Sequence, residues 1–237
     1  MKFSEMPYVR PDMQAAFKEM DGLTARVKSA ASAGEVLAAY KEMDALMSKV
    51  DTPLSIASIR HTVNTTDQFY AGEDEFINEQ YPLIAEKTQA FSRAVYDSPF
   101  REELVKEMGS LLFKNIELDL KSFSPEIIPL MQEENKLCTE YQKLYASARL
   151  EFMGKTVTIA QLGPYKQDPD RAVRKAAIEA EGSFFDQHQA ELDEIYDKLV
   201  KNRTAQAREL GYENYVELGY YRMNRNCYGR KEVENFR

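Results

Sequence analysis

Apolar side chains recur three and four residues apart over most of the chain, which is the spacing of one face of an α-helix. Two such stripes follow one another near the start: Met13, Phe17, Met20 and Val27, and then Val36, Tyr40, Met43, Met47 and Val50. The small residues Ala33-Gly34 lie between them. The pattern therefore predicts two antiparallel helices that form a hairpin.

Prolines beside hydroxyl or carboxyl side chains mark the expected helix boundaries. Asp51-Thr52-Pro53 is expected to end the second helix and begin a third, because proline lacks the N–H that a helix interior needs. Ser98-Pro99, Ser124-Pro125 and Asp168-Pro169-Asp170 each place an N-cap residue before proline. Each of these three sites is expected to open a new helix.

Two longer helices are expected between these boundaries. One covers residues 72–97, with a bend at Pro82, where a backbone donor is missing. Helical spacing after residue 168 continues to Gly182 or through it, and the next helix is expected to end at Gly211. A glycine directly after a helix adopts the left-handed conformation without strain.

One stretch breaks the helical period. From Arg149 to Ile159 the apolar residues alternate on each side of Gly154-Lys155, a pair that suits a type II′ turn. The sequence therefore predicts an all-α, multi-helical fold with one short β-hairpin near 149–159.

The composition narrows the class of partner. The chain has 237 residues, a formal charge of −8, 43% hydrophobic and 30% charged residues, which is ordinary globular usage. An acidic surface disfavours nucleic acid, and no segment approaches the roughly 20 apolar residues that span a bilayer. The only cysteines, Cys138 and Cys227, are expected to be free thiols in a reducing cytoplasm.

Candidate catalytic chemistry is sparse. His61 and His188 are the only histidines, and no H-E-x-x-H, C-x-x-C or glycine-rich phosphate loop is present. His188 precedes Glu191 and Glu194 at spacings that can in principle supply metal ligands, but a solvated polar helix face explains the same pattern. His61 is interpreted as a surface or packing residue.

The remaining reactive groups also have simple structural interpretations. Gly72-Glu73-Asp74-Glu75 is expected to complement a helix N-terminus through its negative charge. A calcium role is disfavoured because the ligand spacing of a calcium loop is missing. Cys138 is expected to be a buried structural thiol, and Cys227 an exposed one with no neighbouring base. We therefore expect no catalytic, cofactor-binding or metal-binding residue within residues 1–237.

Two sequence blocks point to a family. The first contains the hairpin with Ile159-Ala160-Gln161-Leu162 and residues 170–177; the second contains residues 201–215 and Leu218-Gly219-Tyr220-Tyr221-Arg222-Met223-Asn224-Arg225. In this order the blocks resemble the family of oligoendopeptidase F and thimet oligopeptidase, zinc metallopeptidases that cut short peptides. The resemblance is most specific over 149–228, and residues 1–148 resemble the family's variable helical front lobe only in kind.

The resemblance implies a role as the N-terminal portion of such an enzyme. In the family, two helical lobes enclose a channel with one zinc on its floor, held by H-E-x-x-H and a later glutamate that follow the block at 218–225. The resemblance implies that residues 1–182 form the front lobe and that residues 183–237 are the start of a truncated catalytic lobe. It also implies that the chain forms one wall of the channel and is inactive by itself. Zinc belongs to the full-length parent, and none is expected in this chain. The implied partners are short peptides and either the missing catalytic half or a homodimer that covers its interface.

Two alternatives remain. The chain is a stand-alone acidic helical scaffold without catalysis, or an enzyme that uses His188 with its two glutamates. A fragment should leave exposed a face formed by Tyr215, Leu218, Tyr221 and Met223, whereas a scaffold should not. Four residues are expected to face either the channel or the lobe junction, and none is assigned to binding: Tyr220, Tyr221, Arg222 and Arg225.

Overall fold

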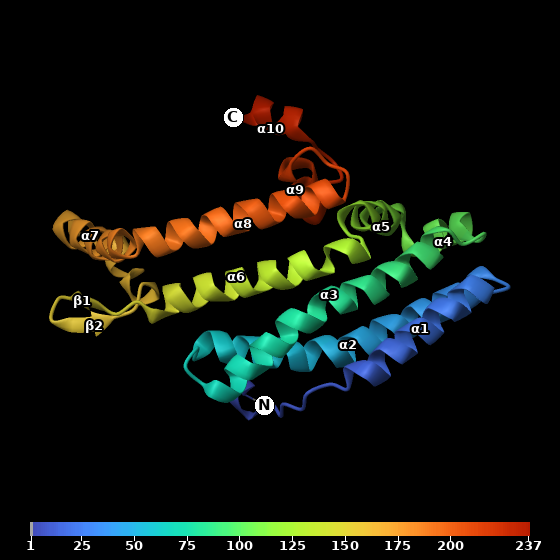
Figure 1. Cartoon of the computed structure of the whole chain (residues 1–237), viewed down its shortest axis with the longest axis horizontal. Coiled ribbons are helices and arrows are strands. Elements are labelled where there is room, and N and C mark those ends of the chain that lie inside the picture. Colours follow the sequence, from blue (N-terminus) through green and yellow to red (C-terminus); the bar gives the residue numbers. More distant parts are fainter. Residues whose placement is uncertain (1) are drawn as a thin grey trace.

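The computed structural model describes residues 2–237, which form a helical molecule with one β-hairpin (Figure 1). The α-helices are α1 (Met13–Ser29), α2 (Ala33–Val63), α3 (Gln68–Tyr96), α4 (Arg101–Met108), α5 (Ser110–Ser122), α6 (Ile128–Ser147), α7 (Arg171–Gln187), α8 (Gln189–Glu209), α9 (Tyr215–Arg222) and α10 (Arg230–Phe236). Short 3₁₀ helices are η1 (Phe3–Glu5), η2 (Pro125–Ile127), η3 (Ala160–Leu162) and η4 (Tyr165–Gln167), and the strands are β1 (Leu150–Phe152) and β2 (Lys155–Val157). The predicted fold class is confirmed.

The first three helices form a bundle. Asp12 caps α1 by accepting a hydrogen bond from the N–H of Ala15, and Ser32 caps α2 in the same way from Glu35. The predicted helical hairpin is confirmed, with its turn at residues 30–32, just before Ala33. Helix α3 packs against both α1 and α2. Buried apolar residues from α1 to α4, together with Phe113 of α5, form the first hydrophobic core.

The expected helix boundary at Pro53 is wrong, because α2 continues through it to Val63. Val50, Leu54 and Ala57 are all buried, so the apolar stripe passes the proline without a change of phase. Burial of that stripe outweighs the one backbone hydrogen bond that proline removes.

Helix α3 confirms the predicted long helix with an internal Pro82, but it begins four residues earlier than expected. Asp67 caps it, accepting hydrogen bonds from the N–H groups of Phe69 and Tyr70. The acidic run at 72–75 therefore lies in the second turn rather than at the N-terminus. Its expected role of complementing the helix end is taken by Asp67 instead.

The region between residues 98 and 128 contains more breaks than expected. The Oγ of Ser98 accepts a hydrogen bond from the N–H of Phe100, and α4 begins one residue later. Gly109, with a φ of 88°, separates α4 from α5, a conformation that a residue with a Cβ rarely adopts. Pro125 opens η2, which leads directly into α6, as its position predicts, although the Ser124 side chain makes no cap bond.

The β-hairpin is confirmed, but its turn is not the expected one. Phe152 pairs with Lys155, so the two loop residues are Met153 and Gly154. Both have positive φ, at 51° and 76°, which defines a type I′ rather than a type II′ turn. The paired strands place Leu150, Phe152 and Val157 on one buried face.

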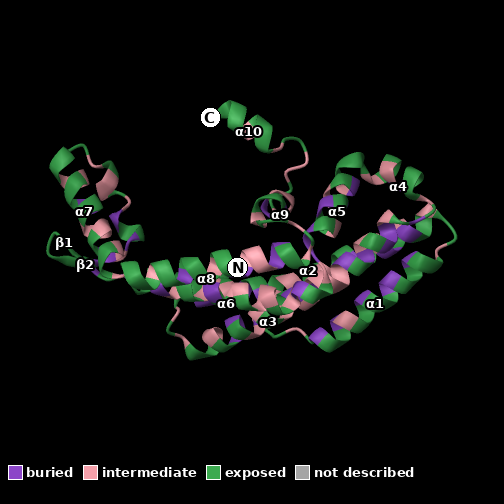
Figure 2. Cartoon of the chain, turned by 45° about the horizontal axis from the view of Figure 1, so that its top comes forward, coloured by how far each residue is buried: buried purple, intermediate pink, exposed green. Residues whose placement is uncertain are grey.

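A second hydrophobic core lies beside the hairpin. It combines the hairpin, η3, α7 and the adjoining ends of α6 and α8. Helices α6 and α8 lie side by side, with α7 and the hairpin at one end and α5 and α9 at the other (Figure 1). Buried residues gather on the inner faces of the first bundle and around α7, whereas α10 buries no residue (Figure 2). The molecule thus has two cores joined by a helical pair.

The boundaries of α7 and α8 refine the remaining expectations. Asp170, and not Asp168, caps α7 by accepting a hydrogen bond from the N–H of Ala172. Helix α7 continues through Gly182 to Gln187, so the expected lobe boundary between residues 182 and 183 falls inside a helix. Gly211 follows α8 with a φ of 84°, as predicted for a glycine after a helix end.

Candidate functional site

A carboxylate on α6 fixes the position of α9. Glu134 accepts hydrogen bonds from Nε of Arg203 at 2.6 Å and from Nε2 of Gln206 at 2.8 Å, both on α8. It also accepts one from Nη1 of Arg222, on α9, at 3.2 Å. Arg222 in turn donates through Nη2 to Oε1 of the fully buried Gln206 at 2.5 Å. Three helices therefore meet at one charged hydrogen-bond network.

Two opposing effects set the ionisation of Glu134. Burial raises the pKa of this carboxyl, but hydrogen bonds from Gln206 and Arg203 and the charge of Arg222 outweigh burial. The net pKa is below its usual range, so Glu134 is ionised at neutral pH. The arginine side chains are partly open to solvent, whereas the Glu134 side chain is only 14% exposed.

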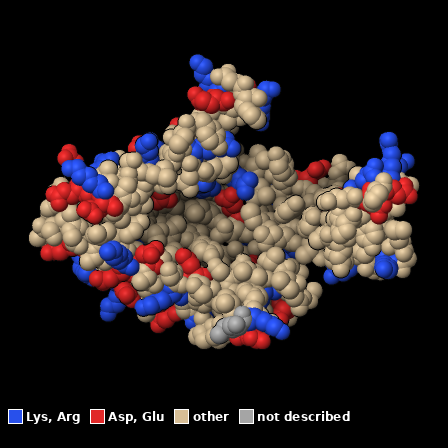
Figure 3. All heavy atoms as spheres, turned by 180° about the vertical axis from the view of Figure 1, so that it is seen from behind, with Lys and Arg blue, Asp and Glu red and all other residues tan. Residues whose placement is uncertain are grey.

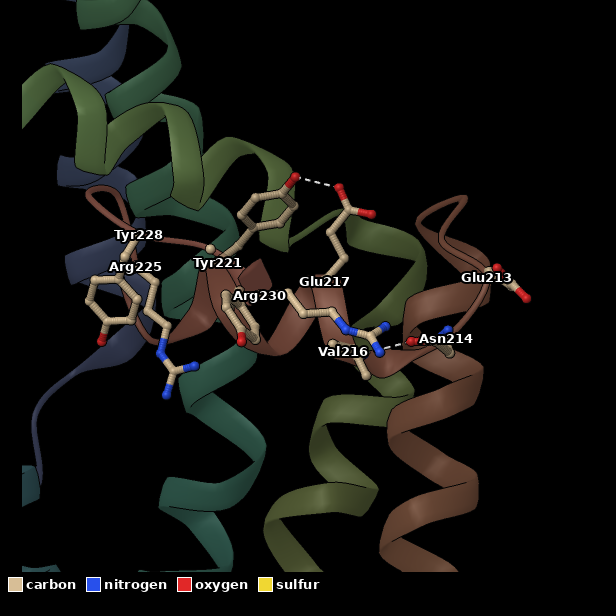
Figure 4. A pocket seen from close by; sticks show the side chains of 10 residues that line it. Glu213, Asn214, Val216, Glu217, Tyr221, Arg225, Tyr228 and Arg230 are labelled. Carbon is tan, nitrogen blue, oxygen red and sulfur yellow. Dashed lines mark hydrogen bonds between the residues drawn. The ribbon is translucent and has the colours of Figure 1, made fainter. Parts of the chain in front are cut away.

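The same junction opens into a cavity of about 400 Å³ between α9 and the start of α10 (Figure 4). Its walls are Glu213, Asn214, Val216, Glu217, Tyr220, Tyr221, Arg225, Tyr228, Gly229 and Arg230. Asn214 caps α9 by accepting a hydrogen bond from the N–H of Val216. This volume lies in the range of small-molecule and peptide pockets.

Three tyrosines and two arginines give the cavity its chemistry. The guanidinium of Arg225 lies over the ring of Tyr220, 4.5 Å from its centre, and over Tyr228 at 5.5 Å. The Tyr221 hydroxyl donates to Glu217 at 2.5 Å, and this bond raises the pKa of Tyr221 to about 12. Arg230 donates to Glu234 at 2.6 Å. Arg230 is therefore paired with a carboxylate, whereas Arg225 contacts aromatic rings.

The four residues expected at a channel or lobe junction separate into two groups. Tyr220, Tyr221 and Arg225 line the cavity, whereas Arg222 points to Glu134. The apolar face that was expected to stay exposed is only partly so. Leu218 is fully buried and Met223 is 55% exposed. Leu218 is covered because α9 packs on α5 and α8 within the chain itself.

His188 does not form a site with both Glu191 and Glu194. It lies between α7 and α8, where its Nδ1 is 3.2 Å from Oε2 of Glu191 and its ring packs on Phe184. Glu194 instead pairs with Nζ of Lys198 at 2.7 Å. Among residues 2–237, no group of three His, Cys, Asp or Glu side chains is placed to hold a metal ion.

The other histidine and the acidic run join helices together. His61 is a packing residue, 2% exposed, and its Nε2 lies 3.9 Å from Oδ2 of Asp74. Asp74 also accepts a hydrogen bond from Thr139 of α6 at 2.9 Å. Glu73 accepts hydrogen bonds from the Tyr8 hydroxyl and from Arg10, which fix the N-terminal segment on α3.

Both cysteines are free thiols. Cys138 is half-buried on α6, and burial raises the pKa of its thiol. Cys227 is exposed and donates to Oδ1 of Asn226 at 2.9 Å. The raised pKa disfavours the thiolate form of Cys138, so this thiol is not activated.

The Glu134 network was not predicted from the sequence. Its members on α8 are Asn202, Arg203 and Gln206, and Asn202 and Gln206 are buried at helical spacing on the same side as apolar residues. Polar residues within an apolar stripe were the available signal. Their partner on α6 was not predictable, because it depends on which two helices pack.

No helix within residues 2–237 is both long enough and apolar enough to cross a membrane.

Comparison with known proteins assigns the family. The sequence profile described as "Peptidase M3 N-terminal domain" matches residues 3–123, about half of the chain. This chain belongs to the peptidase M3 family through that domain. No curated protein sequence matches the chain.

Solved structures extend the likeness to the whole chain. PZ peptidase A, solved with an inhibitor, is 42% identical over 99% of this chain, with a TM-score of 0.93. An oligoendopeptidase F is 42% identical over 100% of the chain, also with a TM-score of 0.93. Another, from Bacillus anthracis strain Ames, is 38% identical over 100%, with a TM-score of 0.92. The chain spans only 42%, 42% and 43% of these structures, in the same order.

Proposed function

We propose that this chain is the helical N-terminal part of a zinc-dependent oligopeptidase and forms one wall of a channel for short peptides. The observation that carries the proposal is the likeness, at 42% identity over nearly the whole chain, to PZ peptidase A and to an oligoendopeptidase F. Sequences this similar share their backbone, and the family assignment agrees with that likeness.

The shape of the molecule supports a wall rather than a closed domain. The face opposite to that of Figure 1 is hollowed between the α6–α8 pair and the first bundle, and charged side chains border the hollow (Figure 3). Between α3 and α6 lies a cavity of about 350 Å³, lined by residues that include Glu75, Asn78, Lys136 and Lys143. Polar, open surfaces of this kind suit the passage of a flexible peptide better than tight binding of one compact ligand.

Zinc is assigned to the parent protein and not to this chain. His61 packs beside Asp74 in the first bundle, and His188 contacts Glu191 where α7 meets α8, so the two imidazoles do not share a site. The residues present therefore do not fit a catalytic zinc, which takes three protein ligands. We assign no step of peptide hydrolysis to residues 2–237. We propose that the zinc ligands lie in the remainder of the parent protein, since this chain covers only 42% of PZ peptidase A.

Three further points belong to the same proposal. The front lobe occupies residues 1–182 and the catalytic lobe begins at 183, so α7 runs from one lobe into the other. The remaining catalytic half, or a second copy of this chain, covers surface that is exposed here, such as Met223. A cytoplasmic location is in keeping with two free thiols.

Parallel assays of two proteins test this function. Residues 1–237 and the full product of the source gene are assayed with a fluorescence-quenched oligopeptide, and zinc is measured in each. We expect the gene product to cleave the peptide, to lose that activity with a chelator, and to contain one zinc. Residues 1–237 alone should neither cleave the peptide nor contain zinc. A gene product of the same mass as this chain, without activity, would contradict the proposal and favour the acidic scaffold.

A further inference from the structure

Arg225 is a cation without a carboxylate partner. No carboxylate of residues 2–237 forms an ion pair with it, and its side chain forms no hydrogen bond within this range. Arg225 is a half-buried residue, and its guanidinium lies over the rings of Tyr220 and Tyr228. The two rings lie within cation–π distance of the guanidinium, and none of its N–H groups forms a hydrogen bond within residues 2–237, so these donors are available to a ligand.

The charge of the surroundings makes this arrangement unusual. The chain carries 39 acidic and 31 basic residues, and the other arginine of the cavity, Arg230, is already paired with Glu234. Arg225 and Tyr228 lie together on one side of the cavity, while Glu217 and Glu213 lie on the other (Figure 4). An unpaired guanidinium that faces a cavity is suited to a single carboxylate, which it can bind through two parallel hydrogen bonds.

The other walls restrict the class of anion. Glu213 and Glu217 repel a ligand with several negative charges, such as a nucleotide or a polyphosphate. Val216 and the tyrosine rings offer apolar surface beside the guanidinium, as the side chain of an amino acid requires. A peptide C-terminus has these features: it carries one carboxylate, beside an apolar side chain and amide N–H donors.

We propose that Arg225, which contacts the rings of Tyr220 and Tyr228, binds the C-terminal carboxylate of a short peptide in the cavity between α9 and α10. This inference rests on the proposed function of the chain as part of an oligopeptidase. The carboxylate lies in the plane of the guanidinium, and the last side chain of the peptide contacts Val216 and Tyr220. Glu217, fixed by Tyr221, lies across the cavity and is available to accept a peptide N–H.

Titration calorimetry with residues 1–237 tests the site. The probes are an N-acetylated Ala-Phe-Ala-Leu peptide with a free C-terminus, the same peptide as its C-terminal amide, and that amide with Glu in place of the second Ala. We expect the free acid to bind about tenfold more tightly than either amide, because a hydrogen bond to a charged group is lost in the amides. Arg225→Gln abolishes this preference, and Arg171→Gln, the same change at an exposed arginine on α7, retains it.

Four outcomes would overturn the proposal: no binding of the free acid at millimolar concentration, equal affinity for acid and amide, tight binding of the Glu-containing amide, or an unchanged preference in Arg225→Gln. Circular dichroism shows whether the variant is folded, and Tyr228→Phe, which keeps the stacked ring, should keep the preference. Failure of the peptidase assay leaves these measurements unaffected. If residues 1–237 prefer the free acid but the gene product lacks peptidase activity, the carboxylate site is supported and the proposed function is contradicted.

Discussion

A single carboxylate, Glu134, contacts α8 and α9 from α6, so its ionisation contributes to the stability of their junction. Its folded-state pKa is lowered, because the hydrogen bonds and positive charges of its partners outweigh the effect of burial. A group of this kind stabilises the fold at pH values above its unfolded pKa, which is about 4.3 for glutamate. That contribution is lost as the pH falls through the lower, folded value.

Glu134→Gln removes the charge while it nearly keeps the shape. We expect the free energy of unfolding at pH 7 to fall by about 2 kcal/mol, because charge-assisted hydrogen bonds to two arginines are weakened. The difference between the wild type and the variant should begin to shrink below about pH 4.3, where the carboxyl of the unfolded chain becomes protonated, and should disappear as the pH falls through the lower folded-state pKa. Urea unfolding at a series of pH values measures both effects.

Glu117→Gln is the matched control for this change. Glu117 forms an exposed pair with Lys121 one turn away on α5, and such pairs contribute less than about 0.5 kcal/mol. If Glu117→Gln lowers the free energy of unfolding as much as Glu134→Gln does, the three-helix network stabilises the protein no more than an exposed ion pair.

Sequence reasoning about individual residues reached part of this junction. From the family resemblance, Tyr220, Tyr221 and Arg225 were expected to face a channel or the lobe junction, with no assignment to binding, and they line a cavity. Glu134 was missed because it looks like any other glutamate on an amphipathic helix. Its role arises from a contact 69 residues away along the chain, with Arg203.

At the scale of elements, the chain contains two helices with internal prolines, and they differ in burial. Pro53 is half-buried within α2, whereas Pro82 is fully buried within α3. Each removes one backbone hydrogen bond from its helix. The ring of Pro82 also fills space in the packed interior, which the ring of Pro53 does only in part.

Pro53→Ala should therefore stabilise the protein. We expect the free energy of unfolding to rise by about 1 to 3 kcal/mol, since alanine restores the hydrogen bond and has the higher helix propensity. Pro82→Ala should gain less, because each buried CH₂ that it removes costs about 0.8 kcal/mol. Chemical denaturation ranks the two variants, and a destabilised Pro53→Ala would mean that α2 needs its proline.

The turn of the β-hairpin offers a second test at this scale. Met153 is exposed and has a φ of 51°, a conformation that asparagine adopts more readily than methionine. Met153→Asn should raise the free energy of unfolding by about 0.5 kcal/mol or slow amide exchange in the strands, because Asn-Gly is a favoured type I′ pair. Lys155→Asn, in an extended strand position, should show neither effect. Amide hydrogen exchange distinguishes the two.

The elements themselves were largely predictable, and their connections were less so. The hairpin at 13–50, the long α3, the β-hairpin and the glycine after α8 follow from local periodicity and backbone preference. The helix end expected at Pro53 was wrong, because apolar residues buried on both sides of Pro53 keep α2 continuous. The turn type failed because the register, which tertiary packing sets, moved the loop by one residue.

At the scale of the whole molecule, there are two hydrophobic cores, one built from residues of the first half of the chain and one from residues of the second half. They share no buried residue. The connection between them includes polar contacts, such as Asn202 to the carbonyl of Leu130 and the Glu134 network. Cores that share no buried residue can open as separate cooperative units.

Leu162→Ala tests that separation. Leu162 is fully buried in the second core, and the substitution should lower its stability by about 3 kcal/mol. Hydrogen exchange should then accelerate in the hairpin, α7 and the adjoining helix ends, and stay unchanged in α1–α3. Leu54→Ala, in the first core, should give the reverse pattern. Uniform acceleration in either variant would show a single cooperative unit.

The α6–α8 pair has a mechanical consequence. Helix α8 has 21 residues, so it is about 30 Å long at 1.5 Å per residue. A rotation of about 5° at the α9 junction would move its far end by about 2.6 Å over that length. If α6 and α8 rotate together, a small angular change near Glu134 would therefore displace the hairpin by about the width of an atom.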